Sequence, residues 1–239
     1  MNSGMVLGLI PARGGSKSIK KKNIRHLLGK PLISYTIECA LACSFIDKAV
    51  VSTDDPEIAD ISKESGAEVP FIRPPELAMD DTPMLPVMQH AIETVEAIYR
   101  EKVNILILLD PTSPLRRVKD IEEALSLFHH DDACQAVVSG CKAHRSPYFN
   151  MVRLEDGFVQ ILIHTDKDIG RRQDCPSAYD LDTTVWIYSR EAIMDIRKRI
   201  PPRTRLYIVP EERSIHIDTE LDFMIVEFLM RESSKVTDA

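Results

Sequence analysis

Short apolar runs alternate with longer amphipathic segments along the first part of the chain. Residues 5–11, MVLGLIP, are almost entirely apolar, which is typical of a strand buried on both faces. The strongest such run is 103–116, and its apolar part ends abruptly at Asp110 and Pro111. The predicted strands are 5–11, 46–55, 68–76, 103–116 and 133–141, and the predicted helices are 31–44, 56–67, 84–102 and 118–131. This alternation predicts right-handed βαβ units and therefore an α/β fold with a mainly parallel sheet.

The rhythm changes after residue 141. Residues 148–164 alternate apolar and polar side chains on either side of Asp156-Gly157, which predicts a β-hairpin. The remaining predicted elements are strands at 183–189 and 205–211 and an amphipathic helix at 219–233. We therefore expect a single domain over residues 1–239, with a small β lobe of about 142–182 inserted into the main sheet.

Composition narrows the class of protein and of ligand. The chain has 239 residues, 44% hydrophobic and 28% charged, which are ordinary values for a globular protein with one substantial core. Its net charge of −7 disfavours a general nucleic-acid binder. No apolar stretch reaches the roughly 18 residues that cross a membrane, and no signal-peptide pattern is present. The five cysteines form no CxxC pair, which is typical of reduced thiols in a cytoplasmic protein.

Polar clusters follow three of the predicted strands, at 12–23, 53–55 and 110–117. Because ligands of parallel sheets bind beyond the carboxyl ends of the strands, these clusters are expected to converge on one site.

The first cluster has the composition of a phosphate-binding loop. Gly14 and Gly15 let backbone N–H groups turn toward a ligand, and Arg13, Lys17 and residues 20–22 add positive charge. The spacing is not that of a Walker P-loop. A local basic cluster in an acidic chain favours a small anionic ligand, here a triphosphate.

The block IPARGGSKSIKKKN at 10–23 resembles the signature of the acylneuraminate cytidylyltransferases, the CMP-sialic acid synthetase family. Further blocks follow in the family's order over nearly the whole chain: VVSTDD (50–55), RPPELAMDDTPM (73–84), DPTSPLR (110–116), RRQD (171–174) and IDTELD (217–222). The resemblance implies a three-layer α/β/α fold of the nucleotide-diphospho-sugar transferase type. It also implies a homodimer formed through the inserted lobe.

The resemblance assigns site residues by their positions in these blocks. The catalytic candidates are Arg13, Lys17, Lys22 and Asp218. The nucleotide-binding candidates are Arg13, Gly14, Gly15, Ser16, Lys17, Asn23, Arg73, Asp80 and Thr82. The sugar-binding candidates are Asp110, Ser113, Arg116, Arg172, Gln173 and Asp182. The metal candidates are Asp218 and Asp110.

The implied reaction is transfer of CMP from CTP to a nine-carbon 2-keto sugar acid of the sialic, legionaminic or pseudaminic kind. The anomeric hydroxyl attacks the α-phosphorus and pyrophosphate leaves, so cations and Mg²⁺ stabilise the charge on the phosphate oxygens. Mg²⁺ takes few protein carboxylates, so Asp218 alone is sufficient in principle. An arginine fork suits a carboxylate, which makes Arg172 the choice for the sugar's acid group, acting on the partner's site.

Three positions depart from the family's pattern. Asp110 stands where the family usually has Gln, Asp182-Thr183-Thr184 replaces Asn-Gly-Ala, and the metal motif begins with His216 instead of Asp. A carboxylate that faces an anionic sugar is unfavourable unless it is paired. Asp110 therefore either meets an amine on the sugar or ligates the metal, and a loss of activity is a third alternative.

Other functions fit parts of the same pattern. The basic loop and Asp218 also suit an eight-carbon ulosonate substrate of the KDO type, although the PTSPLR and RRQD blocks favour nonulosonates. A CTP-binding regulator without turnover and a nucleic-acid binder are the non-enzyme alternatives. The acidic balance of the chain argues against the last of these.

Overall fold

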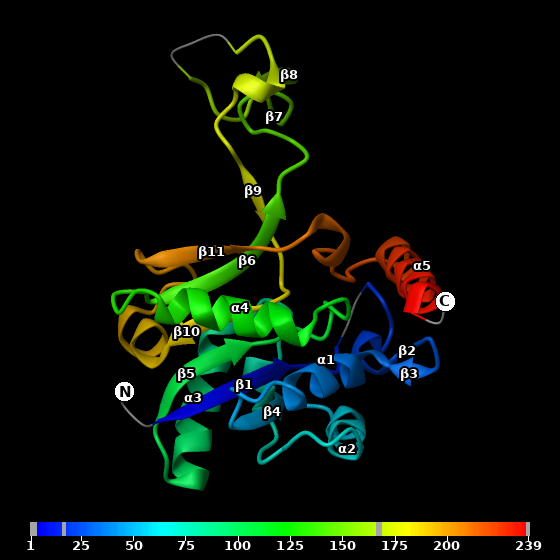
Figure 1. Cartoon of the computed structure of the whole chain (residues 1–239), viewed down its shortest axis with the longest axis vertical. Helices are drawn as coiled ribbons and strands as arrows, with labels where there is room; N and C mark the ends of the chain where they lie inside the picture. Colours follow the sequence, from blue (N-terminus) through cyan, green and yellow to red (C-terminus); the bar gives the residue numbers. More distant parts are fainter. Residues whose placement is uncertain (1–3, 16–17, 166–168, 238–239) are drawn as a thin grey trace.

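The computed structural model describes residues 4–15, 18–165 and 169–237. Its centre is a seven-stranded sheet in the order β11-β6-β10-β5-β1-β4, with β9 paired to β6 (Figure 1). The strands are β1 (Met5–Pro11), β4 (Lys48–Ser52), β5 (Val103–Leu108), β6 (Ala136–Lys142), β9 (Tyr179–Leu181), β10 (Trp186–Ser189) and β11 (Thr204–Ile208). Strand β1 runs parallel to β4 and β5, and β11 runs parallel to β6, whereas β10 is antiparallel to both of its neighbours. The predicted mixed, mainly parallel sheet is confirmed.

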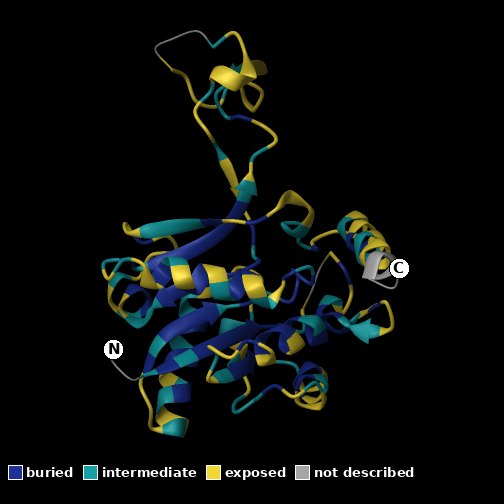
Figure 2. Cartoon of the chain, viewed as in Figure 1, coloured by how far each residue is buried: buried dark blue, intermediate teal, exposed yellow. Residues whose placement is uncertain are grey.

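Helices cover both faces of the sheet and give the three predicted layers (Figure 1). They are α1 (Leu32–Leu41), α2 (Pro56–Glu64), α3 (Met84–Tyr99), α4 (Val118–His129) and α5 (Glu220–Thr237), with a π-helix at Ala192–Ile196. Helices α1 and α4 pack on one face through Ile37 and Leu125, and α3 packs on the other through Ile92. In β1, Ile10 joins the first cluster and Leu9 joins the second, so both faces of this apolar strand are buried (Figure 2).

Helix α5 lies beside the N-terminal loop and away from the main sheet (Figure 1). Its Phe223 and Val226 form a separate apolar cluster with Ile19, Leu27 and Ile217. The neighbouring small elements are β2 (His26–Leu27), β3 (Lys30–Pro31) and the 3₁₀ turns Lys22–Ile24 and Glu211–Arg213. This packing brings the segment before α5 next to the loop after β1. Among the described helices, none is long and apolar enough to cross a membrane.

Between β6 and β10 the chain leaves the sheet and extends into a lobe (Figure 1). At its far end β7 (Val152–Glu155) and β8 (Phe158–Ile161) form the expected hairpin, with Asp156 and Gly157 in the left-handed region at φ of 52° and 83°. These values are typical of a tight hairpin turn. Most of the lobe is exposed (Figure 2).

One predicted strand, at 68–76, is wrong. Only Glu68 pairs with the sheet edge, as an isolated bridge to Val50. The prolines that follow lack the N–H groups that a ladder requires, and the segment ends instead in a 3₁₀ turn at Pro75–Leu77. This irregular path carries Arg73 over the end of β4.

Several boundaries also differ from the predictions. Strand β5 is six residues long and ends at Leu108, and 109–117 forms the turn that follows it. Helix α3 ends at Tyr99 because Arg100 adopts a left-handed backbone with φ of 56°. The short strands β2, β3 and β9 and the five-residue π-helix were not predicted, since so few residues carry too weak a hydrophobic pattern.

Candidate active site

The loops that follow β1 and β5 and the segment 73–87 meet around a cavity of about 250 Å³. Its lining contains many of the residues expected at the site: Arg13, Lys22, Asn23, Arg73, Asp80, Thr82 and Asp110. These side chains come from separate polar clusters of the sequence, and the parallel strands bring them to one edge of the sheet.

The loop after β1 is held open by polar contacts of its backbone. The Gly14 N–H donates to Asp54 Oδ1 at 3.1 Å, and the Asn23 side chain donates to the Arg13 carbonyl at 3.1 Å. A Cβ at Gly14 would lie 2.5 Å from Asp55 Oδ2, so the approach requires glycine. Ser16 and Lys17, which complete the predicted phosphate loop, lie outside the described residues.

Arg13 and Asp80 form an ion pair at the mouth of the cavity. Arg13 Nη1 lies 2.8 Å from Asp80 Oδ1, and both side chains are partly exposed. Thr82, nearby on the same loop as Asp80, donates to the Glu76 carbonyl at 3.2 Å. The structure thus joins a predicted phosphate ligand to a predicted nucleotide-binding carboxylate.

Arg73 is a buried cation in the wall of the cavity, only 4% exposed. Its Nε donates to Ser52 Oγ at 3.0 Å, and its Nη2 donates to the Ser52 carbonyl. Burial lowers the pKa of Arg73 to about 10, while the negative charge of Asp54 opposes this change and that of Arg13 adds to it. The guanidinium remains charged at neutral pH, and among the described residues no carboxylate pairs with it. It therefore favours an electron-rich ligand.

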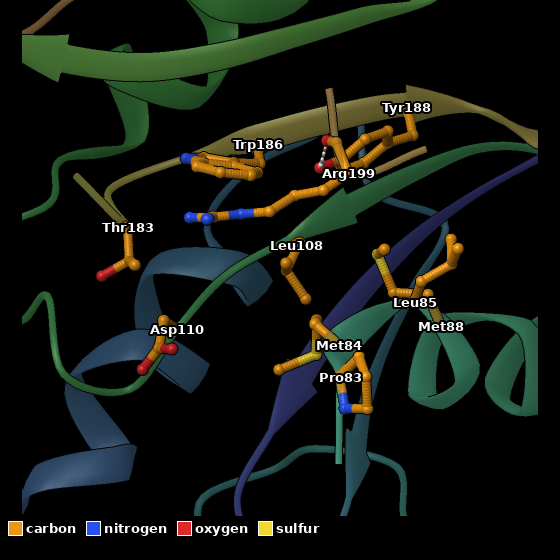
Figure 3. A pocket seen from close by; sticks show the side chains of 10 residues that line it. All are labelled: Pro83, Met84, Leu85, Met88, Leu108, Asp110, Thr183, Trp186, Tyr188 and Arg199. Carbon is orange, nitrogen blue, oxygen red and sulfur yellow. Dashed lines mark hydrogen bonds between the residues drawn. The ribbon is translucent and has the colours of Figure 1, made fainter. Parts of the chain in front are cut away.

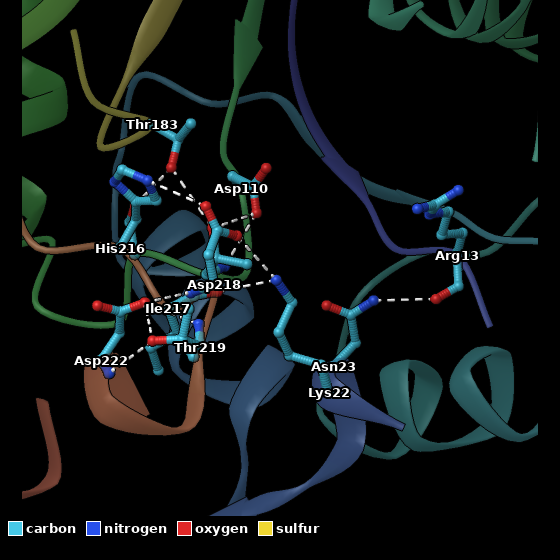
Figure 4. A network of polar contacts seen from close by, with 12 residues as sticks. Arg13, Lys22, Asn23, Asp110, Thr183, His216, Ile217, Asp218, Thr219 and Asp222 are labelled. Atoms are coloured by element: carbon cyan, nitrogen blue, oxygen red, sulfur yellow. Dashed lines mark hydrogen bonds and ion pairs between the residues drawn. The ribbon is translucent and has the colours of Figure 1, made fainter. Parts of the chain in front are cut away.

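Lys22 and the segment before α5 form a second polar centre (Figure 4). Lys22 Nζ donates to the Ile217 carbonyl at 2.8 Å and to Asp218 Oδ1 at 3.1 Å. His216 Nε2 lies 3.2 Å from Asp218 Oδ2. The N–H groups of Asp218 and Thr219 donate to the side chain of Asp222, in the first turn of α5, and these contacts fix the direction of the loop.

The donor set around Asp218 suits only some metals. Over the described ranges there is no group of three or more His, Cys, Asp or Glu side chains that could hold an ion. Asp218 is 61% exposed and offers a carboxylate, which is a ligand type that Mg²⁺ prefers. The residues fit an Mg²⁺ ion that obtains most of its ligands from phosphate oxygens and water, and they do not fit a preformed protein cage.

Asp110 stands between this cavity and a second one of about 400 Å³ (Figure 3). Its Oδ1 accepts hydrogen bonds from the Thr112 N–H at 2.9 Å and the Thr112 hydroxyl at 2.7 Å. The Ser113 hydroxyl lies 2.8 Å from Thr183 Oγ1. Ile217 is tied to the same turn, because its N–H donates to the Thr112 carbonyl at 2.8 Å.

A model of the cytidylyltransferase family matches residues 7–226. The chain belongs to this family. Three relatives have similar length. CMP-N,N'-diacetyllegionaminic acid synthase of Campylobacter jejuni is 36% identical over 94% of both chains. Post-translational flagellin modification protein B of Campylobacter coli is 34% identical over 96% of both. Pseudaminic acid cytidylyltransferase of Campylobacter jejuni is 31% identical over 94% of this chain and 96% of the other.

Solved structures of cytidylyltransferases share the fold. CMP:2-keto-3-deoxy-manno-octonic acid synthetase, complexed with CTP, superposes with a TM-score of 0.66 and 19% identity over 96% of this chain and 99% of the other. A 4-diphosphocytidyl-2C-methyl-D-erythritol synthase from Anaerococcus prevotii gives a TM-score of 0.67 and 11% identity, covering 95% and 99%. At such identities the likeness concerns the fold alone.

In this cytidylyltransferase two of the residues predicted to bind the sugar are buried and form hydrogen bonds within the fold. Arg116 is 6% exposed and donates to the carbonyls of Asp110 and Thr183, at 2.7 and 3.2 Å. Asp182 is 2% exposed, and its carboxylate accepts hydrogen bonds from Thr184 N–H at 2.8 Å and Ser214 Oγ at 2.7 Å. These contacts orient the loops that carry Asp110 and Thr183.

Arg172 and Gln173 lie in the lobe, in the 3₁₀ turn Arg172–Asp174, and are exposed. Arg172 Nη2 donates to the Ala143 carbonyl at 3.3 Å, near the base of the lobe. Within one chain the cytidylyltransferase does not bring these two side chains to either cavity.

The sequence analysis did not identify the wall of the second cavity. Trp186 is only 6% exposed, yet it lines the cavity together with Tyr188 and Arg199. The two aromatic residues are two positions apart on β10, so they share one face of the strand. That spacing is the signal that the sequence offered. Nothing in the sequence placed Arg199 against them.

Proposed function

We propose that this cytidylyltransferase transfers CMP from CTP to the anomeric hydroxyl of a nonulosonic acid and releases pyrophosphate. The observation that carries the proposal is the cavity at the carboxyl ends of the strands, in which Arg13, Lys22 and Arg73 are gathered. Three cations around one cavity of an acidic protein suit a polyanion of about the size of a nucleoside triphosphate.

The loop after β1 holds the phosphates. Gly14 and Gly15 leave its backbone open to a ligand, and Ser16 and Lys17 belong to the same proposal on the strength of the sequence. Arg13 reaches the phosphates by exchanging its contact with Asp80 for a phosphate oxygen. This exchange costs little, because an exposed ion pair contributes only about 0–1 kcal/mol.

The other side of the same cavity receives the nucleoside. Arg73 is held rigidly by Ser52 and lies within the cavity wall, so it suits the carbonyl oxygen of a cytosine ring. Asp80 and Thr82 border the cavity on the loop that follows, where they suit ribose hydroxyls. Asn23 keeps the phosphate loop in register through its contact with the Arg13 carbonyl.

The reaction is an in-line displacement at the α-phosphorus. The anomeric oxygen of the sugar forms the new bond to phosphorus, the bond to the β-phosphate oxygen breaks, and the hydroxyl proton passes to solvent. Negative charge increases on the departing pyrophosphate, and Arg13 and Lys22 stabilise it. An Mg²⁺ ion at Asp218 supplies a Lewis acid to the phosphate oxygens when it is bound. Lys22 keeps the Asp218 carboxylate directed toward the phosphate loop.

The sugar is expected on the far side of Asp110 from the nucleotide. Asp110, Ser113 and Thr183 present oxygen atoms there, and Arg116 and Asp182 hold their loops. The acid group of the sugar requires a cation that can form paired hydrogen bonds. We assign it to Arg172 of the partner subunit, because this chain's own lobe points away from its cavity (Figure 1).

A homodimer is part of the proposal. The hairpin of the lobe exposes large apolar side chains, with Leu154 76%, Phe158 73% and Val159 64% exposed. Apolar side chains gathered at the tip of a projecting lobe are typical of an interface. The cysteines of the described chain are free thiols, which fits the cytoplasm, where CTP is available.

The direct test is release of pyrophosphate from CTP and Mg²⁺ with a panel of sugar acids that includes N,N'-diacetyllegionaminate, pseudaminate, N-acetylneuraminate and KDO. We expect release with a nonulosonate and little with KDO. Arg13→Ala should abolish it, while the exposed Arg231→Ala serves as a control. If CTP binds but no sugar acid yields pyrophosphate, the protein is a nucleotide-binding regulator and the proposed reaction is wrong.

A further inference from the structure

The cavity of about 400 Å³ on the far side of Asp110 has an unusual lining. Most of its wall is apolar or aromatic: Pro83, Met84, Leu85, Met88, Leu108, Trp186 and Tyr188. Two charged side chains of opposite sign interrupt this wall, Asp110 and Arg199. Figure 3 shows the Arg199 side chain along the face of the Trp186 ring, with its guanidinium toward the side of the cavity where Thr183 and Asp110 lie.

Arg199 is held in this position by two aromatic residues. Its guanidinium carbon lies 5.0 Å from the centre of the Trp186 ring, and its carbonyl accepts a hydrogen bond from the Tyr188 hydroxyl at 2.8 Å. The indole N–H of Trp186 is itself fixed on the Asp182 carbonyl at 2.6 Å. Within the described chain, the Arg199 guanidinium makes no hydrogen bond or ion pair. A stacked guanidinium of this kind keeps its N–H donors available for a ligand.

Asp110 provides the matching acceptor. Its Oδ1 accepts both hydrogen bonds from Thr112, and Oδ2 has no partner among the described residues. The carboxylate is fixed by the turn after β5, so Oδ2 is held in place before any ligand arrives.

The two charges select against a charged substituent. An ammonium group attracted by Asp110 would be repelled by Arg199, and a carboxylate attracted by Arg199 would be repelled by Asp110. A neutral secondary amide uses both, because its carbonyl accepts and its N–H donates. An acyl methyl group would then contact the apolar wall around Met84, Leu85 and Met88, which a hydroxyl would leave unfilled.

We infer that this cavity binds an acylamido substituent of the sugar acid, and that Arg199 is a specificity-determining residue. Arg199 donates to the amide carbonyl oxygen, and Asp110 accepts the amide N–H. The inference rests on the proposed function in one respect, since it takes the ligand to be a sugar acid. It favours an amide over the free amine as the group that meets Asp110.

The chain contains a single tryptophan, so its fluorescence reports on this cavity. The probes are N-acetylneuraminate, N,N'-diacetyllegionaminate and the neuraminate analogue in which a hydroxyl replaces the acetamido group. We expect the acylated sugars to change the Trp186 fluorescence of the full-length protein. Arg199→Ala should weaken their binding by about 10- to 100-fold, the usual effect of removing a hydrogen bond to a charged group. The affinity of Arg199→Lys for the acylated sugars should lie between those of the wild type and Arg199→Ala, because lysine keeps the charge but lacks the planar fork.

The controls separate this inference from the proposed reaction. CTP affinity should be unchanged in Arg199→Ala, and the exposed Arg203→Ala should behave like the wild type. If Arg199→Ala weakens the binding of acylated and hydroxyl sugars equally, or if no sugar changes the fluorescence, the proposed amide contact is wrong. If the fluorescence distinguishes acylated sugars from the hydroxyl analogue but no pyrophosphate is released, the result contradicts the cytidylyl transfer and supports the subsite. Pyrophosphate release that Arg199→Ala leaves unchanged for every sugar overturns the subsite alone.

Discussion

Lys22 and Asp218 are 196 positions apart in the sequence, yet Lys22 Nζ lies 3.1 Å from Asp218 Oδ1. The contact joins the N-terminal loop to the segment before α5, and the Ile217 carbonyl supports it at 2.8 Å from the same nitrogen. Lys22 is the more buried partner, at 13% exposure against 61% for Asp218. The contact holds the Asp218 carboxylate beside Lys22, which lines the cation-lined cavity, although Asp218 itself lines a neighbouring cavity with His216.

Asp218→Asn should reduce turnover by about 100- to 1000-fold, because the neutral amide is a poor ligand for Mg²⁺. The exposure of the side chain predicts little change in stability. Pyrophosphate release over a titration of Mg²⁺, together with thermal unfolding, measures both effects. Asp60→Asn, an exposed substitution on α2, is the matched control. Full activity in Asp218→Asn would locate the metal elsewhere.

Arg13→Ala should abolish measurable CTP binding, because it removes a cation from the phosphate loop. Asp80→Asn offers a sharper comparison. It releases Arg13 from its 2.8 Å partner, so triphosphate affinity should be retained or improved while ribose discrimination declines. Calorimetry with CTP and with dCTP measures these affinities. Wild-type CTP affinity in Arg13→Ala would remove the loop from the binding site.

Asp110→Gln distinguishes the two roles left open for Asp110. We expect the ratio of kcat/KM for the acylated sugars to kcat/KM for the hydroxyl analogue to fall, with the Mg²⁺ requirement unchanged, because Asp110 lines the cavity that we propose for the acylamido group. A rise in the Mg²⁺ concentration needed for half activity would instead make Asp110 a metal ligand.

The Glu96–Arg190 pair gives a pH-dependent contribution to stability. Arg190 donates to the Glu96 carboxylate at 2.8 and 3.0 Å, and these hydrogen bonds lower the pKa of Glu96 below its ordinary value of 4.5, although burial opposes them. Because the folded pKa is the lower one, the contribution is present above pH 4.5 and is lost as the pH falls toward the folded value.

The variant Glu96→Gln should therefore lower the free energy of unfolding by about 1–2 kcal/mol at neutral pH. The difference from the wild type should narrow in urea unfolding below pH 4.5. A constant difference across this range would mean that packing, and not the charge of Glu96, accounts for the loss.

Phe158→Asp should convert the proposed homodimer into a monomer, because it introduces a charge at an exposed apolar side chain of the hairpin. The monomer should bind CTP normally but lose affinity for the sugar acid, since Arg172 of the partner subunit is then absent. Sedimentation and calorimetry measure the two properties. Glu155→Gln is the control, because it changes the same hairpin without adding a charge, and it should remain a dimer. If the wild type and Phe158→Asp have the same mass in sedimentation, the proposed interface is wrong.

The strand at 68–76 illustrates where the sequence pattern failed. Its apolar residues suggested a ladder, but the prolines removed the donors that a ladder needs, and the segment instead curves to carry Arg73. Asp182 illustrates a second difference. Its position in the family pattern predicts a sugar contact, which stays a prediction, and the structure adds that its side chain accepts hydrogen bonds from Thr184 and Ser214 within the fold.

The sequence by itself determined most of the strands and helices of the sheet region, the position of the hairpin turn and the glycine-rich, basic composition of the loop after β1. These features depend on local periodicity, on glycine and on charge, which a linear pattern records. Only the tertiary structure decided that Lys22 meets Asp218, that Arg116 is committed to backbone carbonyls and that Arg199 stacks on Trp186. Such contacts join segments far apart in the chain, and their geometry arises from packing rather than from spacing.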